Sequence, residues 1–163
     1  MKLFTHALID GLILSALASS VLIVTLLINP RLFLQDYPAD IQEKVPPKTQ
    51  REKRQSLIAG IPFMLILLAL PIWSTVHLKQ SGVEAIWSLV LNAFGVAFVF
   101  NLFDLLVLDW FMFCTVTPRF LVIPGSEGSP AYKDYGYHFR GALVGTALSA
   151  AAGLVIGFFI WLI

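Results

Sequence analysis

The residues best suited to chemistry in this sequence are polar side chains inside or beside long apolar stretches. Asn101, Asp104 and Asp109 fall in the second half of one such stretch. His138 and Arg140 directly precede another. An ionisable side chain within a membrane span costs roughly 2.5 to 3.5 kcal/mol on insertion scales unless it is paired or faces water. We therefore predict that Asp104 pairs with Arg140 or His138, either as a structural tie or as part of a substrate or proton site.

Arginines between the apolar stretches could add cationic groups to this site. Arg51, Arg54 and Arg119 have the planar donors that bind phosphate, for example on an anionic lipid headgroup. The other interpretation is that they set the orientation of the chain and touch anionic lipid. The candidate ligand-binding residues are Asn101, Asp104, Asp109, Arg119, His138 and Arg140.

A second group of ionisable residues lies near other helix ends. His6 and Asp10 are four residues apart, so they share one face of a helix, and His77 follows a later apolar stretch. These are ligand types for a divalent metal, but no close-spaced motif such as His-Glu-x-x-His accompanies them. We therefore predict no metal site and interpret His6 and Asp10 as an ion pair or hydrogen bond near the membrane interface; the alternative is a proton or metal site.

No sequence motif assigns a reaction or a cofactor. The chain has no nucleophile elbow, no phosphate-binding glycine loop and no dinucleotide fingerprint. The sequence therefore leaves open whether the protein is an enzyme.

Composition places these residues in an integral membrane protein. The chain of 163 residues is 58% hydrophobic and 13% charged, with a mean hydropathy of +0.81, whereas charged residues make up about a quarter of a soluble domain. The net charge of +1 argues against a nucleic-acid partner, because such proteins carry a basic patch. The single cysteine, Cys114, excludes an internal disulfide.

The apolar stretches predict an all-α polytopic protein with one transmembrane domain over 1–163. Four helices are expected to span the bilayer, at about residues 4–28, 57–78, 83–107 and 141–163. The second helix should begin before its span, because Thr49 and Glu52 have the capping-box spacing. The third should leave the membrane around Asp109, with residues 111–123 lying along the interface or covering the end of the bundle.

The distribution of basic residues predicts the orientation. The N-terminus and the turn after the second helix hold Lys2 and Lys79, whereas the two long loops hold the other nine of the eleven lysines and arginines. Basic loops stay in the cytoplasm, so we expect two long cytoplasmic loops and both termini outside, in a plasma membrane or bacterial inner membrane.

Small residues recur at a spacing of four in the first and last helices. The last helix carries Gly141, Gly145, Ser149, Gly153 and Gly157, and the first carries Gly11, Ser15 and Ser19. Small residues let helix backbones approach closely in lipid. We therefore predict that the first and last helices pack together along these two ridges.

Two function classes follow from these patterns. The first is a polar site at the cytoplasmic end of the bundle, which binds an amphiphilic or small polar ligand for transport or lipid modification. The second is a non-catalytic accessory or assembly subunit, whose small-residue ridge docks onto other helices in a homo- or hetero-oligomer. The lipid bilayer is a partner under both hypotheses.

Overall fold

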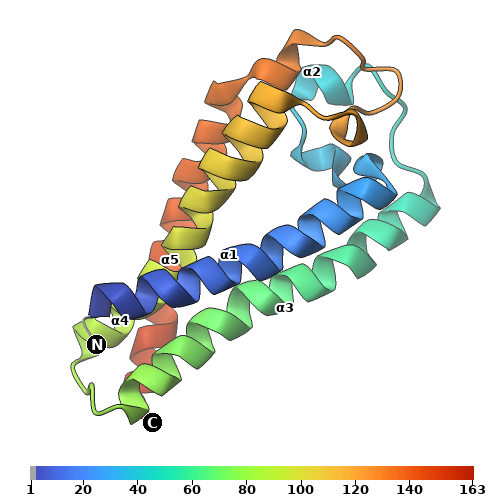
Figure 1. Cartoon of the computed structure of the whole chain (residues 1–163). Coiled ribbons are helices and arrows are strands. Elements are labelled where there is room, and N and C mark those ends of the chain that lie inside the picture. The colour runs from blue at the N-terminus through green and yellow to red at the C-terminus, as the bar shows by residue number, and fades with distance from the viewer. Residues whose placement is uncertain (1–2) are drawn as a thin grey trace.

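The computed structural model describes residues 3–163 and, over that range, contains helices and connecting segments without strands. The long helices are α1 (Leu3–Ile28), α3 (Gln50–Gln80), α4 (Ile86–Phe103) and α5 (Tyr135–Leu162) (Figure 1). A π-helix, η2 (Asp104–Val116), continues α4 without a break. With α4 and η2 counted as one, all four are long and apolar enough to cross a membrane, which confirms the predicted all-α class.

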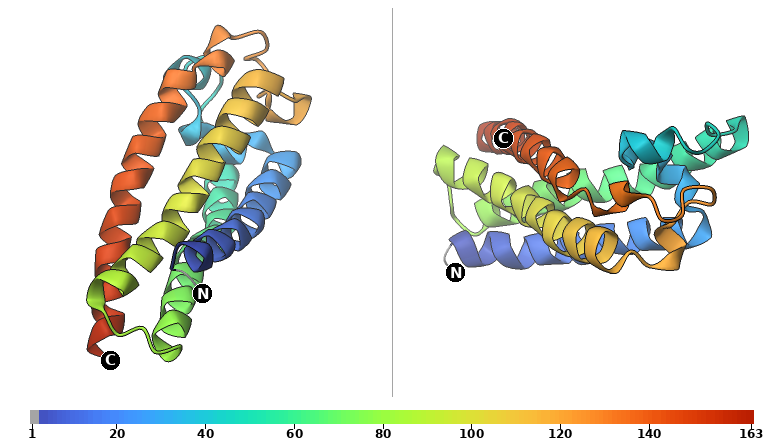
Figure 2. Two further views of the ribbon diagram at one scale, coloured as in Figure 1. Left: turned by 60° about the vertical axis from the view of Figure 1, so that its left-hand side comes forward. Right: turned by 90° about the horizontal axis from the view of Figure 1, so that it is seen from above.

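The four helices form two pairs that diverge. α1 lies beside α3, and α4 with η2 lies beside α5 (Figures 1 and 2). The pairs come together where the chain ends and the short turn 81–85 lie, which we call the terminal end. They separate toward the opposite end, which we call the loop end because both long connections lie there (Figure 1). α4 packs against all three other long helices and is the centre of the bundle.

The predicted contact between the first and last helices is wrong. Both small-residue ridges face α4 instead. A methyl group added to Gly11 would lie 2.5 Å from Val99 Cβ, and one added to Gly157 would lie 2.5 Å from Val90 Cα. A small-residue ridge permits close approach of any helix, and its spacing does not identify which one.

The start of α3 is the predicted capping box. The Thr49 hydroxyl accepts a hydrogen bond from the Glu52 N–H at 3.2 Å, and the Glu52 carboxylate accepts one from the Thr49 N–H at 2.7 Å. These bonds satisfy backbone donors that have no partner inside the helix. The boundary at Gln50 is therefore set by local chemistry, seven residues before the apolar span that starts at Leu57.

The third long helix continues beyond its predicted exit at Asp109. Its backbone widens into the π-helix η2 and remains helical to Val116, so residues 111–116 extend the third helix. Of the two interpretations of residues 111–123, the structure agrees with the one in which they cover the end of the bundle, because Phe113, Leu121 and Ile123 lie in a buried cluster there. Thr117 ends η2 with φ of 47°, in the left-handed region, and donates its N–H to the Met112 carbonyl at 2.9 Å. α5 likewise begins earlier than residue 141, at Tyr135, because the Asp134 carboxylate caps it by accepting the Tyr137 N–H at 2.8 Å.

The two long connections fold together into one layer over the loop end, which we call the loop cap (residues 29–49 and 117–134). It contains η1 (Pro30–Asp36), α2 (Ala39–Gln42), η3 (Arg119–Leu121) and η4 (Pro130–Lys133). Its apolar side chains form a buried cluster with the end of η2: Leu34, Tyr37, Ile41, Val45, Phe113, Cys114, Leu121, Ile123, Ala131 and Tyr132. The Tyr37 hydroxyl donates to the Leu121 carbonyl at 2.9 Å and so joins the two connections.

Candidate functional site

A cavity of about 690 Å³ lies between the diverging helix pairs, beneath the loop cap. Its apolar wall comes from Leu22 and Leu26 of α1, Phe63 and Leu67 of α3, and Leu148 of α5. This volume lies within the range of roughly 300 to 1,000 Å³ that is usual for small-molecule sites. The cavity exists because the loop cap bridges the helix pairs where they no longer touch each other.

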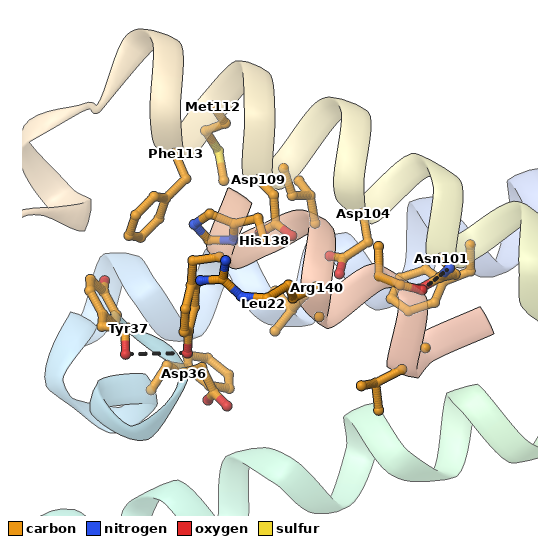
Figure 3. A pocket seen from close by; sticks show the side chains of 18 of the residues that line it. Leu22, Asp36, Tyr37, Asn101, Asp104, Asp109, Met112, Phe113, His138 and Arg140 are labelled. Atoms are coloured by element: carbon orange, nitrogen blue, oxygen red, sulfur yellow. Dashed lines mark hydrogen bonds and ion pairs between the residues drawn. The ribbon is translucent and has the colours of Figure 1, made fainter. Parts of the chain in front are cut away.

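Polar side chains gather at the loop end of this cavity (Figure 3). The α4–η2 helix contributes Asn101, Asp104 and Asp109, and α5 contributes His138 and Arg140. The structure thus brings together five of the six residues predicted to bind a ligand. Arg119 is the sixth; it is exposed on η3 in the loop cap and does not line the cavity.

The π-helix explains why Asp104 and Asp109 line the same cavity. In an α-helix, where each residue turns roughly 100°, positions five apart lie about 140° apart around the axis. A π-helix joins residues five apart by its backbone hydrogen bonds, so such positions lie close to one face. Asp104, Asp109 and the neighbouring Leu108, Met112 and Phe113 therefore all face the cavity.

The ion pairs differ from the predicted ones. His138 Nδ1 lies 2.9 Å from Asp109 Oδ1, and Arg140 Nη2 lies 4.0 Å from Asp134 Oδ2. Neither His138 nor Arg140 pairs with Asp104. The prediction assumed that the third helix ended near Asp109, whereas the continuing π-helix carries Asp109 to the level of His138.

Asp104 differs from the other carboxylates at the site. No side chain or backbone donor among residues 3–163 forms a hydrogen bond or ion pair with it. His138 is 7% exposed, and its Nε2 atom has no hydrogen-bond partner within the same described range. The Phe113 ring meets the His138 ring edge to face, with centroids 4.8 Å apart, so His138 is held between Asp109 and Phe113 (Figure 3).

Asn101 lies deeper along α4 and is fixed by α5. Its amide donates to the Ala142 carbonyl at 3.1 Å and to the Thr146 hydroxyl at 3.0 Å. A methyl group on Gly145 would overlap the Asn101 carboxamide oxygen. Gly145 therefore leaves room for Asn101, and the loop-end half of the glycine ridge shapes the cavity.

Two site residues that the sequence analysis did not single out for ligand binding come from the loop cap. Asp36 of η1 and Tyr37, which follows it, line the cavity (Figure 3), and the Tyr137 hydroxyl donates to the Tyr37 carbonyl at 3.3 Å. Burial raises the pKa of the Asp36 carboxyl from its ordinary value of 3.8, and the Lys48 ammonium opposes this shift. Nothing in their local sequence distinguishes them from headgroup-level residues, because only the folded loop cap brings them to the cavity.

The second predicted group lies at the terminal end, where His6 and Asp10 are buried and His77 is exposed. His6 Nε2 is 3.3 Å from Asp10 Oδ2 and 3.3 Å from the Ser74 carbonyl oxygen, and the His77 ring stacks on His6 at 6.2 Å. The Asn92 amide donates to the Ser74 hydroxyl at 2.9 Å. Among the residues that the structure describes, no three His, Cys, Asp or Glu side chains come together as a metal-binding group.

The cavity thus combines a carboxylate that has no partner within residues 3–163 with aromatic and aliphatic walls. Comparisons of the chain with protein-family models, with curated proteins and with solved structures find no match.

Proposed function

We propose that this is a membrane-embedded protein that binds an amphiphile in the cavity under the loop cap. The ligand tail would lie among Leu22, Leu67 and Leu148, and its polar head would lie beside Asn101 and Asp104. The observation that carries this proposal is the polarity gradient of a single cavity. Its walls are aliphatic between the helix pairs and polar at the loop end, as a ligand with one apolar and one polar end requires.

The distribution of basic residues supports a site that is open to the cytoplasmic leaflet. Nine of the eleven lysines and arginines lie in or next to the loop cap, and such segments remain in the cytoplasm. The polar end of the cavity would then lie at the depth of the cytoplasmic headgroups, and its apolar wall would lie at the depth of the acyl chains.

The assembly hypothesis receives less support, because the chain covers its own ridge. Ser149, Gly153 and Gly157 are buried, and the two glycines lie directly against Phe94 and Val90 of α4. These positions have no surface left for another subunit.

Lipid modification has one specific observation in its favour. His138 Nδ1 lies 2.9 Å from Asp109 Oδ1, so a proton on Nδ1 would face the carboxylate and leave Nε2, which has no hydrogen-bond partner within residues 3–163, as the nitrogen free to take a proton. This is the arrangement of a general base. If the protein modifies a lipid, His138→Gln should abolish the reaction at the ligand head while the amphiphile still binds. If the protein transports its ligand, the same substitution should leave the transport rate unchanged.

Photo-crosslinking tests the proposed amphiphile site. The protein is reconstituted in phosphatidylglycerol nanodiscs with an uncharged tetradecyl glucoside that carries a diazirine in its chain. We expect saturable crosslinks to cavity-lining residues such as Leu67 and Phe100, mapped by peptide mass spectrometry. The exposed residues Ile61 and Leu65 of the same helix α3 report the background from the bilayer.

A pair of matched variants completes the test. Ala142→Phe places a ring in the cavity and should abolish the saturable crosslinks. Ala147→Phe adds the same ring to α5 at an exposed position outside the cavity and should leave them unchanged. Crosslinks that do not saturate, or that are equal in both variants, would overturn the proposed function.

A further inference from the structure

The cavity lining has an excess of negative charge. Three carboxylates line it, from Asp36, Asp104 and Asp109, against one guanidinium, from Arg140. The Arg140 side chain is 70% exposed and its Nη2 lies 4.0 Å from the Asp134 carboxylate, so the guanidinium is engaged at the surface. A head group that enters the cavity therefore meets more negative than positive charge.

The three carboxylates differ in how far the protein satisfies them. His138 satisfies Asp109 at 2.9 Å, and the Gln35 amide donates to Asp36 at 2.7 Å. Asp104 lies farther from the loop end than Asp109 on the same helix, and it receives no hydrogen bond or ion pair within residues 3–163. A carboxylate between apolar walls needs a proton, water or a cationic partner, and the cavity leaves space for that partner beside it.

Aromatic rings also line this cavity. The cavity is lined by Phe33, Tyr37, Phe63, Phe100, Phe113 and Tyr137. The ring of Phe63 meets that of Phe100 edge to face at 6.1 Å, and Tyr37 meets Phe113 in the same way at 5.2 Å. Aromatic faces attract ammonium groups through their quadrupoles, and an aromatic cage with a carboxylate is a recurrent way to bind a quaternary ammonium.

We infer that the head group taken by this cavity is an ammonium, so that the ligand is a cationic amphiphile whose charge pairs with Asp104. This inference rests on the proposed amphiphile site and names its ligand class. The ammonium stands between Asp104 and the aromatic rings, and the alkyl tail extends between α3 and α5. An anionic head would meet three carboxylates and one guanidinium among the side chains that line the cavity.

Competition against the crosslinking probe tests this inference. Unlabelled tetradecyltrimethylammonium, tetradecyl sulfate and tetradecyl glucoside are added in turn to the phosphatidylglycerol nanodiscs, each at a measured mole fraction in the bilayer. We expect the ammonium compound to displace the probe at a mole fraction about tenfold lower than the sulfate or the glucoside. In Asp104→Asn the advantage over the glucoside should fall to about twofold or less, while crosslinking by the glucoside probe persists.

Two controls separate this effect from the general attraction of cations to an anionic bilayer. Asp40→Asn removes the same charge from an exposed position of the loop cap and should leave the tenfold advantage intact. Asp104→Glu keeps the carboxylate and should retain the preference for ammonium. A third experiment adds phosphatidylethanolamine to the nanodisc. If it displaces the probe, the ammonium ligand is a lipid head group; if it does not, the ligand is a single-chain amine.

The results distinguish the two proposals. If the sulfate or the glucoside displaces the probe as well as the ammonium compound does, or if Asp104→Asn keeps the preference, the inferred ammonium site is wrong although an amphiphile site remains. If none of the competitors displaces the probe, the cavity is not an amphiphile site and both proposals fail.

Discussion

The glycines of α5 have two different uses within one helix. Near the terminal end, Gly153 and Gly157 let α4 approach so closely that an added methyl group would lie within 2.5 to 2.7 Å of Phe94 or Val90 atoms. Near the loop end, Gly145 leaves room for Asn101, and an added methyl on Gly141 would meet no atom within 4 Å. The same spacing therefore supports helix packing at one end and an open cavity at the other.

Alanine substitution should separate these two uses. We expect Gly157→Ala to destabilise the fold by about 1 to 3 kcal/mol, because the methyl must push α5 away from the Val90 backbone. Gly141→Ala is the matched control and should be neutral or stabilising by up to about 1 kcal/mol, since alanine is the better helix former. Unfolding of the detergent-solubilised variants measures both. Equal effects would contradict the close packing of α4 and α5.

Asp36 should make binding of the inferred ammonium ligand dependent on pH. Its raised pKa means that it gains a proton at higher pH than an ordinary aspartate does. Because the pKa of Asp36 is higher in the folded than in the unfolded state, its protonation between these two pKa values favours the folded state. Acidification should therefore weaken binding of the ligand, and Asp36 should cause no loss of stability. The other titratable groups that line the same cavity are those of Asp104, Asp109, His138 and Arg140, and the Lys48 ammonium acts on Asp36 from the loop cap.

We expect tetradecyltrimethylammonium to displace the crosslinking probe less effectively as the pH is lowered through the raised pKa of Asp36 toward 3.8. Asp36→Asn should remove this part of the pH dependence, and competition at a series of pH values measures it. A pH profile unchanged by the substitution would show that Asp36 does not contact the ligand.

At the scale of single elements, the π-helix is the feature that creates the polar side of the cavity. It places Asp104 and Asp109 on one face and carries Phe113 into the loop cap. Its last turn leaves backbone carbonyls without helical partners, and Lys133 of η4 satisfies them. The ammonium of Lys133 donates to the carbonyls of Cys114 and Thr115, the latter at 3.0 Å, and to the Thr117 hydroxyl at 2.9 Å.

Removing this cation should loosen the end of η2. In Lys133→Met, we expect amide hydrogen exchange over residues 112–117 to rise, with a loss of about 1 to 3 kcal/mol of local stability. Lys53→Met removes an exposed lysine at the start of α3 and should leave exchange in this segment unchanged. Equal protection in both variants would show that Lys133 does not hold the helix end.

At the scale of the whole molecule, the loop cap and the diverging helix pairs define the cavity together. The cap joins segments separated by more than eighty residues, for example through the Tyr37 hydrogen bond to Leu121. Because both connections pack into one cluster, we expect them to lie on the same side of the membrane. The short turn 81–85 lies at the opposite end of the molecule (Figure 1).

Cysteine labelling tests this topology. Asp40→Cys, Glu127→Cys and Glu84→Cys are made one at a time in a chain carrying Cys114→Ala, and each is exposed to a membrane-impermeant maleimide in intact cells. We expect the cysteines at 40 and 127 to react only after the cells are opened, and the cysteine at 84 to react from outside. Reaction of 40 and 127 from opposite sides would contradict the loop cap itself.

The sequence by itself determined four long apolar helices, the capping box that starts α3, and the concentration of polar residues toward one end of the third and fourth apolar stretches. Each of these follows from local properties: the length of an apolar run, the chemistry of a helix start, and positions along a helix. Only the tertiary structure decided the partner of the glycine ridges, the π-helical turn that aligns Asp104 with Asp109, the pairing of Asp109 with His138, and the entry of Asp36 and Tyr37. These depend on which surfaces meet across the bundle and on a shift of backbone hydrogen bonds from four to five residues, and neither leaves a periodic mark in the sequence.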